Sequence, residues 1–379
     1  MQGPKIPFHR AETVGRELEH VAASVASGHI GAGGPFGDRC ARRLEELLGS
    51  RHVLLTKSCT HALEMMALLL DLGPEDEVIL PSFAYVTTAN AFALRGARVV
   101  FADVERETLN LDPASVRARI TPRTKAIVAL HYAGAACDLR ALSALATERG
   151  IALLEDNAHG LGSSLEGRKL GSFGSLSGVS FHETKTITCG EGGALAVNDE
   201  VMLARAEILL QKGTDRAKFL RGQVRFYSWH GLGSSFEMSE LHAAFLWGQL
   251  ERWDEILGRR VRQWQRYAHE LASWARANDV HLPVVPAGST SSCHIFALRL
   301  PSEAHRERFL KELAAGGVQA TFHYLPLHLS KMGRELGYGP GDCPVSEEAG
   351  ACLARLPLSF GLGDEQQSRV LEVVHEFRV

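Results

Sequence analysis

The chain has 379 residues, 45% of them hydrophobic and 22% charged, and a formal net charge of −3 at pH 7. This length leaves room for a large core and favours two structural domains, whereas a slightly negative charge disfavours a nucleic-acid-binding protein, which usually carries a basic domain or stripe. The seven cysteines are scattered and include no CxxC pair, a pattern typical of a reducing cytoplasm rather than of a disulfide framework or a structural zinc site.

The hydrophobic residues are distributed as in a cytoplasmic protein. Residues 1–10, MQGPKIPFHR, contain no apolar leader segment, so we expect no signal peptide. No run approaches the roughly 18 consecutive apolar residues that a membrane-spanning helix needs. We therefore expect a cytoplasmic location and no contact with a membrane.

Residues 1–245 predict a large domain built from alternating strands and helices. A helical arm is expected over residues 11–27 and a flexible glycine-rich connection over 28–37. Several apolar runs are too continuous for a sheet with one face in water, which favours a mostly parallel sheet buried on both faces. The expected strands cover 52–56, 77–82, 97–104, 124–132, 151–156, 178–183 and 193–198, and the expected helices cover 59–72 with Ser58 as N-cap, 86–95, 113–120 and 139–149.

Residues 246–379 predict a small C-terminal α/β domain. One long helical region, 237–277, has apolar side chains on one face and is expected to bridge the two domains. Prolines and a glycine in 281–289 end this helical pattern. A strand over 294–300, a helix capped by Ser302, a strand over 318–324 and two further helices are expected after it.

The stretch Gly178–Gly193, GVSFHETKTITCGEGG, holds the first candidate for chemistry. Lys185 follows a short apolar strand, and the glycines after it let the backbone come close to a ligand. A lysine in such a place could form a Schiff base with an aldehyde cofactor. The alternative is an ordinary lysine on a surface loop.

Asp156 is the strongest candidate at the carboxyl ends of the strands, where ligands bind in open parallel sheets. It closes the apolar run 151–156 and is followed by Asn157, Ala158 and His159. A carboxylate buried there is costly unless it meets a cation or hydrogen-bond donors. A protonated pyridine nitrogen is such a cation; the alternative is that Asp156 caps the next turn.

Three further features are expected at the same edge of the sheet. Ser58, Cys59 and Thr60 begin a helix whose free N–H groups could bind a phosphate, a role compatible with simple N-capping by Ser58. Tyr85 could stack on a cofactor ring or pack in the core. Ser180 could present its hydroxyl to the phosphate or face a neighbouring strand.

In combination, the motifs resemble those of the DegT/DnrJ/StrS family of nucleotide-sugar aminotransferases. The stretches that carry the resemblance are IPF near the start, SCTHALEMMALLL, DEVILPSFAYVTTANAFALRGARVVFADV, HYAGAACD, LLEDNAHG, GSFGSLSGVSFHETKTITCGEGGAL and HYLPLH, and they span essentially the whole chain. Within the family, SFHETK, QKGTDRAKFLRGQV and GSSFEMSELHAAFLWGQLE are most similar to the WecE type. The resemblance implies an α/β protein of fold type I, like aspartate aminotransferase, that depends on pyridoxal 5′-phosphate (PLP).

The resemblance also implies roles for individual residues. Lys185 is similar to the lysine that forms a Schiff base with PLP and later carries a proton, and Asp156 is similar to the partner of the pyridine nitrogen. His159 stands where the family has Gln or His near the phenolic oxygen of the cofactor. The other cofactor contacts that the resemblance implies are Tyr85 against the ring, and the Cys59 backbone, Thr60 and Ser180 at the phosphate.

One motif departs from the family. Many members have Gly-x-Asn-x-Arg-Met where this chain has GSSFEM at residues 233–238. The asparagine of those members reaches the cofactor phosphate of the neighbouring subunit, and the shorter Ser235 stands in its place. The resemblance thus implies a homodimer with shared active sites, in which Ser235 takes the position of the cross-subunit contact.

The reaction implied by the resemblance moves the amino group of L-glutamate to C4 of a dTDP-4-keto-6-deoxyhexose. The acceptor dTDP-4-dehydro-6-deoxy-D-glucose would become dTDP-4-amino-4,6-dideoxy-D-glucose or -D-galactose, in deoxyaminosugar biosynthesis for an antibiotic or a polysaccharide. The alternative is amination at C3 of a dTDP- or UDP-linked keto sugar. The candidate substrate contacts are Lys212, Arg216 and Arg221 in the basic segment 212–237, which is expected to serve the neighbouring subunit, and His323, Tyr324 and His328 in HYLPLH.

Three other interpretations are weaker. A sugar 3-dehydratase of the same family would have histidine in place of Lys185. A metal hydrolase would use His323, His328 and Asp156, but no HExxH motif or Cys/His cluster supports it, and we expect no metal site. A PLP-binding regulator would need a DNA-binding module, for which neither the length nor the charge leaves room.

Overall fold

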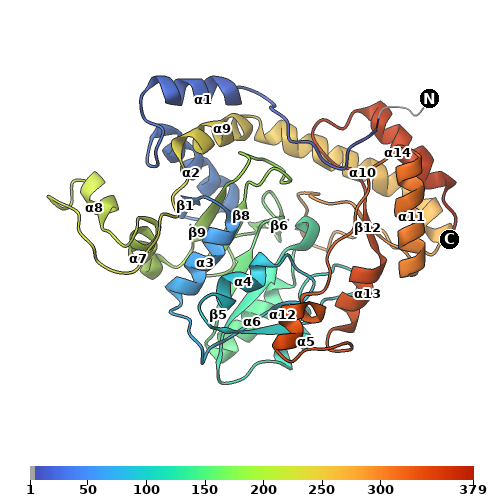
Figure 1. Cartoon of the computed structure of the whole chain (residues 1–379), viewed down its shortest axis with the longest axis horizontal. Helices are drawn as coiled ribbons and strands as arrows, with labels where there is room; N and C mark the ends of the chain where they lie inside the picture. Colours follow the sequence, from blue (N-terminus) through green and yellow to red (C-terminus); the bar gives the residue numbers. More distant parts are fainter. Residues whose placement is uncertain (1–4) are drawn as a thin grey trace.

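The strands expected for the large domain form one sheet in the computed structural model, which describes residues 5–379 (Figure 1). The first four residues of the stretch in which we expect no signal peptide lie outside the described residues. Two antiparallel pairings involve the strand at 193–197, and the other neighbours are parallel, so the expected mostly parallel sheet is confirmed. Within residues 5–379 this sheet has seven strands in the order β1 (His52–Thr56), β9 (Gly193–Val197), β8 (Leu176–Ser180), β5 (Ala152–Asp156), β4 (Thr124–Leu130), β2 (Glu77–Pro81) and β3 (Arg98–Ala102).

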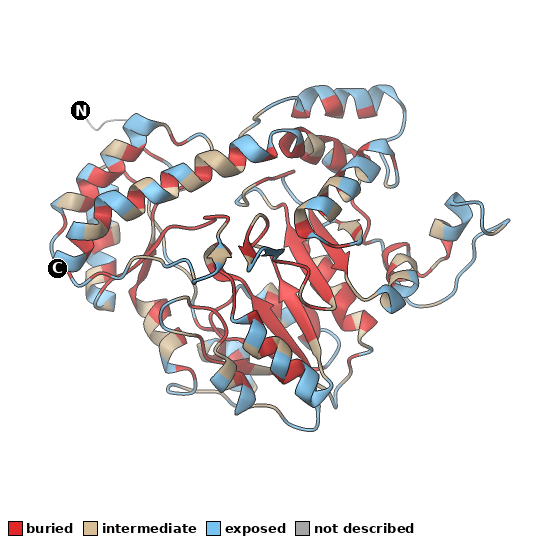
Figure 2. Ribbon diagram, turned by 180° about the vertical axis from the view of Figure 1, so that it is seen from behind, coloured by how far each residue is buried: buried red, intermediate tan, exposed pale blue. Residues whose placement is uncertain are grey.

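Both faces of the sheet are covered, because successive side chains of a strand point to opposite faces. On β2, Val78 and Leu80 join one apolar layer and Ile79 joins the other. Figure 2 shows the central strands buried between helices. On the first face lie α3 (Cys59–Leu69), α4 (Thr87–Ala93) and α7 (Glu200–Leu210), and on the second lie α2 (Pro35–Leu48), α5 (Pro113–Arg117), α6 (Leu139–Arg149) and α9 (Glu240–Glu251).

Helix α2 begins inside the stretch that the sequence predicts as a flexible connection. Pro35 occupies its first turn, and Gly49 follows its last residue in a left-handed conformation (φ 63°). The N-terminal N–H groups of α2 are bound by the carboxylate of Glu240 in α9, to which Phe36 N donates at 2.5 Å. This capping carboxylate is distant in sequence, so the local pattern does not predict where α2 starts.

The expected helical region 237–277 is divided into two helices. Arg252 separates α9 from α10 (Trp253–Ala277) with a non-helical backbone (φ −108°, ψ 16°). Trp253 packs in the core of the large domain and Leu271 packs in the core of the small domain. α10 therefore bridges the two cores, and the domain boundary expected after residue 245 falls inside α9.

The small domain is an α/β unit around a two-stranded antiparallel sheet of β11 (Ala297–Arg299) and β12 (Leu353–Arg355). The expected strand 318–324 does not form. Two of its residues form isolated β-bridges instead, Val318 with Ile6 of the N-terminal segment and Thr321 with Arg355. The helices of the small domain are α11 (Glu303–Ala315), capped by Ser302 as expected, α12 (Lys331–Glu335), α13 (Pro344–Cys352) and α14 (Asp364–Glu376).

The remaining elements are mostly short. The helix α8 lies in the segment that projects from the body of the large domain (Figure 1). In the part of the chain that the structure describes, no helix combines the length and apolarity needed to cross a membrane. The short elements not yet described are α1 (Glu17–Ala26), α8 (Arg216–Leu220), a three-stranded sheet of β6 (Ser164–Leu165), β7 (Arg168–Lys169) and β10 (Ser289–Thr290), and the 3-10 turns Tyr132–Gly134 and Leu327–Leu329.

A buried carboxylate ties the two domains together. Asp103 follows β3 in the large domain, and Val345 and Ser346 begin α13 in the small domain. Asp103 Oδ1 accepts from Ser346 N at 2.8 Å and from Ser346 Oγ at 2.7 Å, and Oδ2 accepts from Val345 N at 2.9 Å. A side chain of one domain thus caps a helix of the other with charge-assisted hydrogen bonds.

We expect Asp103→Ala to lower the free energy of unfolding by about 2–4 kcal/mol, because the three donors at the start of α13 lose their acceptor. Urea denaturation followed by circular dichroism measures this loss. The matched control is Glu148→Ala, which removes an exposed carboxylate paired with Arg117 and Arg149 and is expected to cost about 0–1 kcal/mol. If Asp103→Ala costs no more than this control, the carboxylate does not hold the domains together.

Candidate active site

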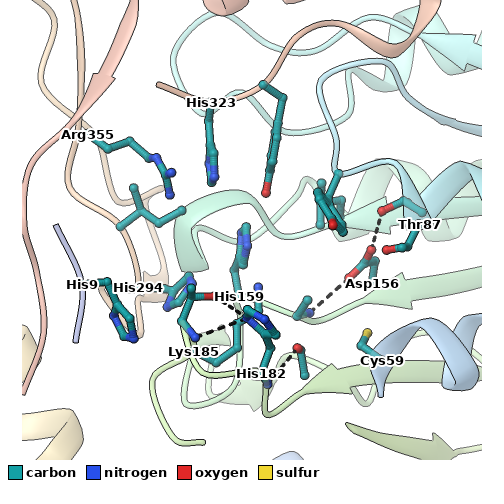
Figure 3. Close-up of a pocket in the computed structure, with 18 of the residues that line it drawn as sticks. His9, Cys59, Thr87, Asp156, His159, His182, Lys185, His294, His323 and Arg355 are labelled. Atoms are coloured by element: carbon teal, nitrogen blue, oxygen red, sulfur yellow. Dashed lines mark hydrogen bonds between the residues drawn. The ribbon is translucent and has the colours of Figure 1, made fainter. Parts of the chain in front are cut away.

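A cavity of about 620 Å³ lies between the two domains, at the carboxyl ends of the central strands (Figure 3). The large domain contributes the ends of β4, β5 and β8 and the first turn of α3, the small domain contributes the end of β12, and the N-terminal segment contributes Phe8 and His9. The expected site residues that line this cavity are Cys59, Thr60, Tyr85, Asp156, His159, Ser180, Lys185, His323 and Tyr324. The structure thus brings together residues that are as much as 265 positions apart in the sequence (324 − 59).

Lys185 follows β8 in a turn, where its backbone N–H donates to the carbonyl of His182 at 2.9 Å. Burial lowers the pKa of its ammonium group. Cys59 and Asp156 act against this shift, and the positive charge of Arg355 adds to it. An amine with a lowered pKa at the wall of a cavity is suited to attack an aldehyde.

The carboxylate of Asp156 lies at the end of β5, inside the cavity. Its Oδ2 accepts from Thr88 Oγ1 at 2.7 Å and its Oδ1 accepts from Ala158 N at 3.2 Å. Burial raises the pKa of Asp156, while these two hydrogen bonds and the charges of Lys185 and His131 act against the rise. Since no salt bridge reaches this carboxylate from within residues 5–379, it is suited to a ligand that brings a protonated nitrogen.

The neighbouring Glu155 is a carboxylate in the opposite situation. It accepts from His131 Nε2 at 3.0 Å and from three backbone N–H groups of the loop 171–174, each at 2.7 Å. Burial by itself would raise the pKa of Glu155, but these donors outweigh it and the pKa is lowered. Glu155 is therefore a satisfied structural carboxylate, whereas Asp156 beside it has only two donors.

The first turn of α3 forms another polar wall of the cavity. Ser58 caps the helix as expected, with its Oγ accepting from His61 N at 3.2 Å, and Cys59 and Thr60 follow it. The N–H groups of a first helical turn have no acceptor inside the helix, so they favour an anion. Gly193 of β9 allows this arrangement, because a Cβ there would lie 2.2 Å from Ser58 C and 2.3 Å from Cys59 N.

His159 lies at the cavity wall with a neutral ring. Its Nδ1 accepts from Ala133 N at 3.3 Å, which assigns the ring proton to Nε2. Burial, reinforced by the charge of Lys185, holds the pKa of His159 well below its usual range. A ring in this state can donate one hydrogen bond to an oxygen of a ligand.

Four rings follow one another along one side of the cavity. The ring centre of His159 lies 4.7 Å from that of His294 and 6.5 Å from that of His323, which is 3.9 Å from Tyr324. Burial lowers the pKa of His323 to about 2, so this ring is neutral as well. Tyr85 is 59% exposed and lies 6.4 Å from Tyr324, so its ring is open to a ligand; the stacking role stays a prediction.

The sequence does not reveal four of the residues that line the cavity. Thr88 lies on the buried face of α4, and Arg355 ends β12. His294 precedes β11, where its Nδ1 lies 3.3 Å from the Thr186 hydroxyl. Phe8 comes from the N-terminal segment, and the motif IPF contains it without indicating a place at the cavity. All four reach the cavity through contacts between segments distant in sequence.

His328 does not line the cavity. It is fully buried, with Nδ1 2.6 Å from Ser82 Oγ and Nε2 3.0 Å from Glu347 Oε1. Both ring nitrogens therefore serve the joint between the domains instead of the substrate contact expected of this residue. The structure also separates His328 from His323 and Asp156, the three groups that a metal hydrolase would need. Within residues 5–379, no three His, Cys, Asp or Glu side chains are grouped to hold a metal ion.

The basic segment 212–237 lies outside the cavity of its own chain. Lys212 and Arg216 lie 3.6 Å and 3.8 Å from the carboxylate of Glu237. Arg221 pairs with a glutamate of α7 at 2.5 Å. The three basic residues expected to bind substrate thus pair with carboxylates of their own chain. The role of these basic residues toward a neighbouring subunit stays a prediction.

Ser235 also lies outside the cavity, at the end of the same segment. Its side chain is exposed, and its Oγ accepts from Lys57 Nζ at 3.2 Å. Its expected contact with the cofactor phosphate of a second chain stays a prediction.

The chain is similar over its whole length to known aminotransferases. The model of the DegT/DnrJ/EryC1/StrS aminotransferase family matches residues 12–375. The solved structure of the aminotransferase TlmJ from Streptoalloteichus hindustanus is 34% identical over 99% of this chain and 98% of that one, with a TM-score of 0.87. Spr1654 from Streptococcus pneumoniae, described as a sugar aminotransferase, is 27% identical in its PLP form over 98% of both chains, with a TM-score of 0.90. DesV from S. venezuelae, in complex with a ketimine intermediate, is 28% identical over 99% of this chain and 98% of that one, with a TM-score of 0.89.

We expect Thr88→Val to raise the pKa of Asp156 further, because the change removes the shorter of its two hydrogen bonds and leaves its burial in place. The carboxyl group then stays protonated to a higher pH. The infrared band of the protonated carboxyl, followed against pH in cofactor-free protein, measures this shift. Thr87→Val is the matched control, since Thr87 lines the same cavity without a hydrogen bond to Asp156. An unchanged titration in Thr88→Val would contradict the role of this bond.

Proposed function

The chain belongs to the DegT/DnrJ/EryC1/StrS aminotransferase family and is a PLP-dependent sugar aminotransferase, and from this premise we propose that it transfers the amino group of L-glutamate to C4 of dTDP-4-dehydro-6-deoxy-D-glucose. The products are 2-oxoglutarate and dTDP-4-amino-4,6-dideoxy-D-glucose or -D-galactose. The observation that carries the proposal is that Lys185, Asp156 and the first turn of α3 line one cavity. The alternative is amination at C3 of a dTDP- or UDP-linked keto sugar.

The groups around the cavity fit PLP in their chemistry. Asp156 is a buried carboxylate that forms no salt bridge within residues 5–379, which suits the protonated nitrogen of a pyridine ring. The first turn of α3, with Thr60, and the hydroxyl of Ser180 offer donors to a phosphate. The Lys185 amine has a pKa lowered by burial, which suits condensation with an aldehyde.

When bound, PLP supplies an aldehyde that condenses with amines and a ring that takes up electrons from the adjacent carbon. Lys185 anchors it and, as a free amine, acts as the base that removes the proton from Cα of the amino donor. Asp156 would keep the ring nitrogen protonated, which the ring needs in order to take up electrons. His159, which carries its ring proton on Nε2, would donate a hydrogen bond to the phenolic oxygen of the cofactor.

The resemblance to the WecE type supports a dTDP-linked acceptor that is aminated at C4, and an assay decides between C4 and C3. The holoenzyme is incubated with L-glutamate and dTDP-4-dehydro-6-deoxy-D-glucose, and the product is analysed by NMR for the carbon that carries nitrogen and for its configuration. An amine at C4 supports the proposal. An amine at C3, or turnover only with a UDP-linked or 3-keto sugar, supports the alternative.

We expect Lys185→Ala to lower turnover by at least about 1,000-fold, because both the anchoring amine and the base are lost. The variant still holds PLP through the phosphate and ring contacts. Borohydride reduction followed by mass spectrometry measures the loss of the anchoring amine separately from activity, since a chain without Lys185 retains no covalent cofactor. Lys125→Ala, at an exposed position of β4, is the control and keeps both properties. Normal turnover of Lys185→Ala would end this assignment.

The proposal includes a homodimer in which the segment 212–237 of one chain completes the cavity of the other. This segment projects from the large domain (Figure 1) and exposes Phe226, Trp229 and Leu232 at 73%, 77% and 70%. Large apolar side chains gathered on a projecting segment favour contact with another chain. Its cations Lys218 and Arg225 have no salt bridge within residues 5–379, which suits them to the diphosphate of a nucleotide sugar.

We expect two separately inactive variants, Lys185→Ala and the double variant Lys218→Ala/Arg225→Ala, to restore activity when they are mixed and allowed to re-dimerise. In a hybrid dimer, one of the two sites combines an intact Lys185 with an intact segment. Random pairing makes half of the dimers hybrid, so recovery of about a quarter of wild-type activity is expected. Hybrid dimers that form but stay inactive would show that the segment does not serve the neighbouring site.

A further inference from the structure

Arg355 is a cation at the wall of the cavity that forms no salt bridge with any described residue of the chain. Its backbone is fixed by hydrogen bonds to Thr321 in both directions, at 2.7 Å from its N–H and 3.3 Å to its carbonyl. Its Nε is buried and, among residues 5–379, meets no hydrogen-bond acceptor. No carboxylate in this range forms a salt bridge with its guanidinium. A half-buried guanidinium whose Nε meets no acceptor is costly, so the site is suited to an anionic ligand.

The N-terminal segment holds the guanidinium flat. The centre of the Arg355 guanidinium lies 4.6 Å from the ring centre of Phe8. Phe8 in turn is anchored by its N–H, which donates to Gln319 Oε1 at 3.3 Å, and by the pairing of Ile6 with Val318. A guanidinium that lies on an aromatic ring keeps its N–H edge available, and this planar edge matches the two oxygens of a carboxylate.

The charges around the cavity leave Arg355 available to a substrate. Asp156 lies at the opposite side of the cavity, in the large domain, where it is the proposed partner of the pyridine nitrogen of PLP. Glu191, the other carboxylate of the lining, is mostly exposed and lies 3.6 Å from His182. After burial, the charge of Arg355 is the next largest cause of the low pKa of His323, so the guanidinium acts strongly on this side of the cavity.

The two substrates differ in the anion that they bring. An amino acid donor carries a carboxylate on the carbon that bears its amino group, whereas the nucleotide sugar carries its charge on the diphosphate, away from the keto carbon of the hexose. A cation facing the same cavity as Lys185 is therefore suited to the donor.

We propose that Arg355 binds a carboxylate of the amino donor and that Phe8 is a positioning residue that acts through Arg355. This inference rests on the proposed function, because it presumes an amino acid as donor. It adds a second anion site to the cavity, formed by the small domain and the N-terminal segment, in addition to the phosphate site at α3.

The test uses Arg355→Gln in the holoenzyme and follows the spectral change of the bound cofactor in single-turnover experiments. L-Glutamate and the dTDP-4-amino sugar, which is the product of the forward reaction, are added separately. We expect the half-saturating L-glutamate concentration to rise about 10- to 100-fold, which corresponds to the loss of charge-assisted hydrogen bonds. The limiting rate with L-glutamate and both parameters with the amino sugar change by less than about threefold. Arg276→Gln, at an exposed position of α10, is the matched control.

Equilibrium binding of glutarate tests the same site without catalysis. Glutarate carries carboxylates and no amine, so it cannot react, and calorimetry gives its dissociation constant for the holoenzyme. Arg355→Gln is expected to weaken it about 10- to 100-fold and Phe8→Leu about 3- to 10-fold, because leucine keeps the apolar contact and loses the ring face. Phe8→Tyr keeps the ring face under the guanidinium, so we expect it to bind glutarate with the wild-type affinity. If residue 8 mattered only for packing, the ring face would not decide the affinity.

The outcomes separate the inference from the function on which it rests. Unchanged affinity for both L-glutamate and glutarate in a folded Arg355→Gln variant overturns the inference, and so does an equal weakening toward the amino sugar. A wild-type holoenzyme that shows no spectral change with L-glutamate contradicts the proposed function. In that case, the glutarate titration still supports or overturns the carboxylate site at Arg355.

Discussion

The burial of Asp156 without a salt bridge from any described residue is the constraint on which the site depends. The end of β5 carries two neighbouring carboxylates, and they are treated differently. Glu155 accepts from His131 and three backbone N–H groups and has a lowered pKa, whereas Asp156 accepts from Thr88 and Ala158 only and has a raised pKa. In such an environment, a ligand that brings a protonated nitrogen stabilises the charged carboxylate, which is what PLP requires of its partner.

The sheet topology places the other cofactor groups around this carboxylate. Strands β5 and β8 are parallel neighbours, with Asp156 paired to Gly178, so Asp156 and the residues that follow β8 meet at one edge. The close contact of Gly193 with the Ser58–Cys59 peptide puts the first turn of α3 at the same edge. A backbone approach of this kind excludes any side chain at residue 193, so the phosphate end of the site depends on packing as well as on capping.

The small domain completes the cavity, and polar contacts between the domains set its position. Asp103 caps α13, and His328 links Ser82 of the large domain with Glu347 of the small domain. These buried groups need their partners, because an unpaired polar group in the interior is costly. Arg355, His323 and Tyr324 therefore face Lys185 only as long as this joint holds.

Elements with a local cause can be predicted from the amino-acid sequence. The apolar alternation predicted β1 and α6 with the observed bounds, and the serine at residue 58 predicted the start of α3. The position of Asp156 at the end of an apolar strand and of Lys185 after another predicted two residues that line the cavity. Each of these depends on periodicity, on a cap or on a strand end, which are properties of a few adjacent residues.

Only the tertiary structure decided the features that need a distant partner. The start of α2 depends on Glu240, the absence of a strand at 318–324 depends on single pairings with Ile6 and Arg355, and Thr88 is recognisable only by its hydrogen bond to Asp156. The same holds for Arg355 on Phe8, 347 positions apart (355 − 8). Local patterns carry no information about such contacts, because the chain brings these groups together only when the sheet, the bridging helix α10 and the N-terminal segment have packed.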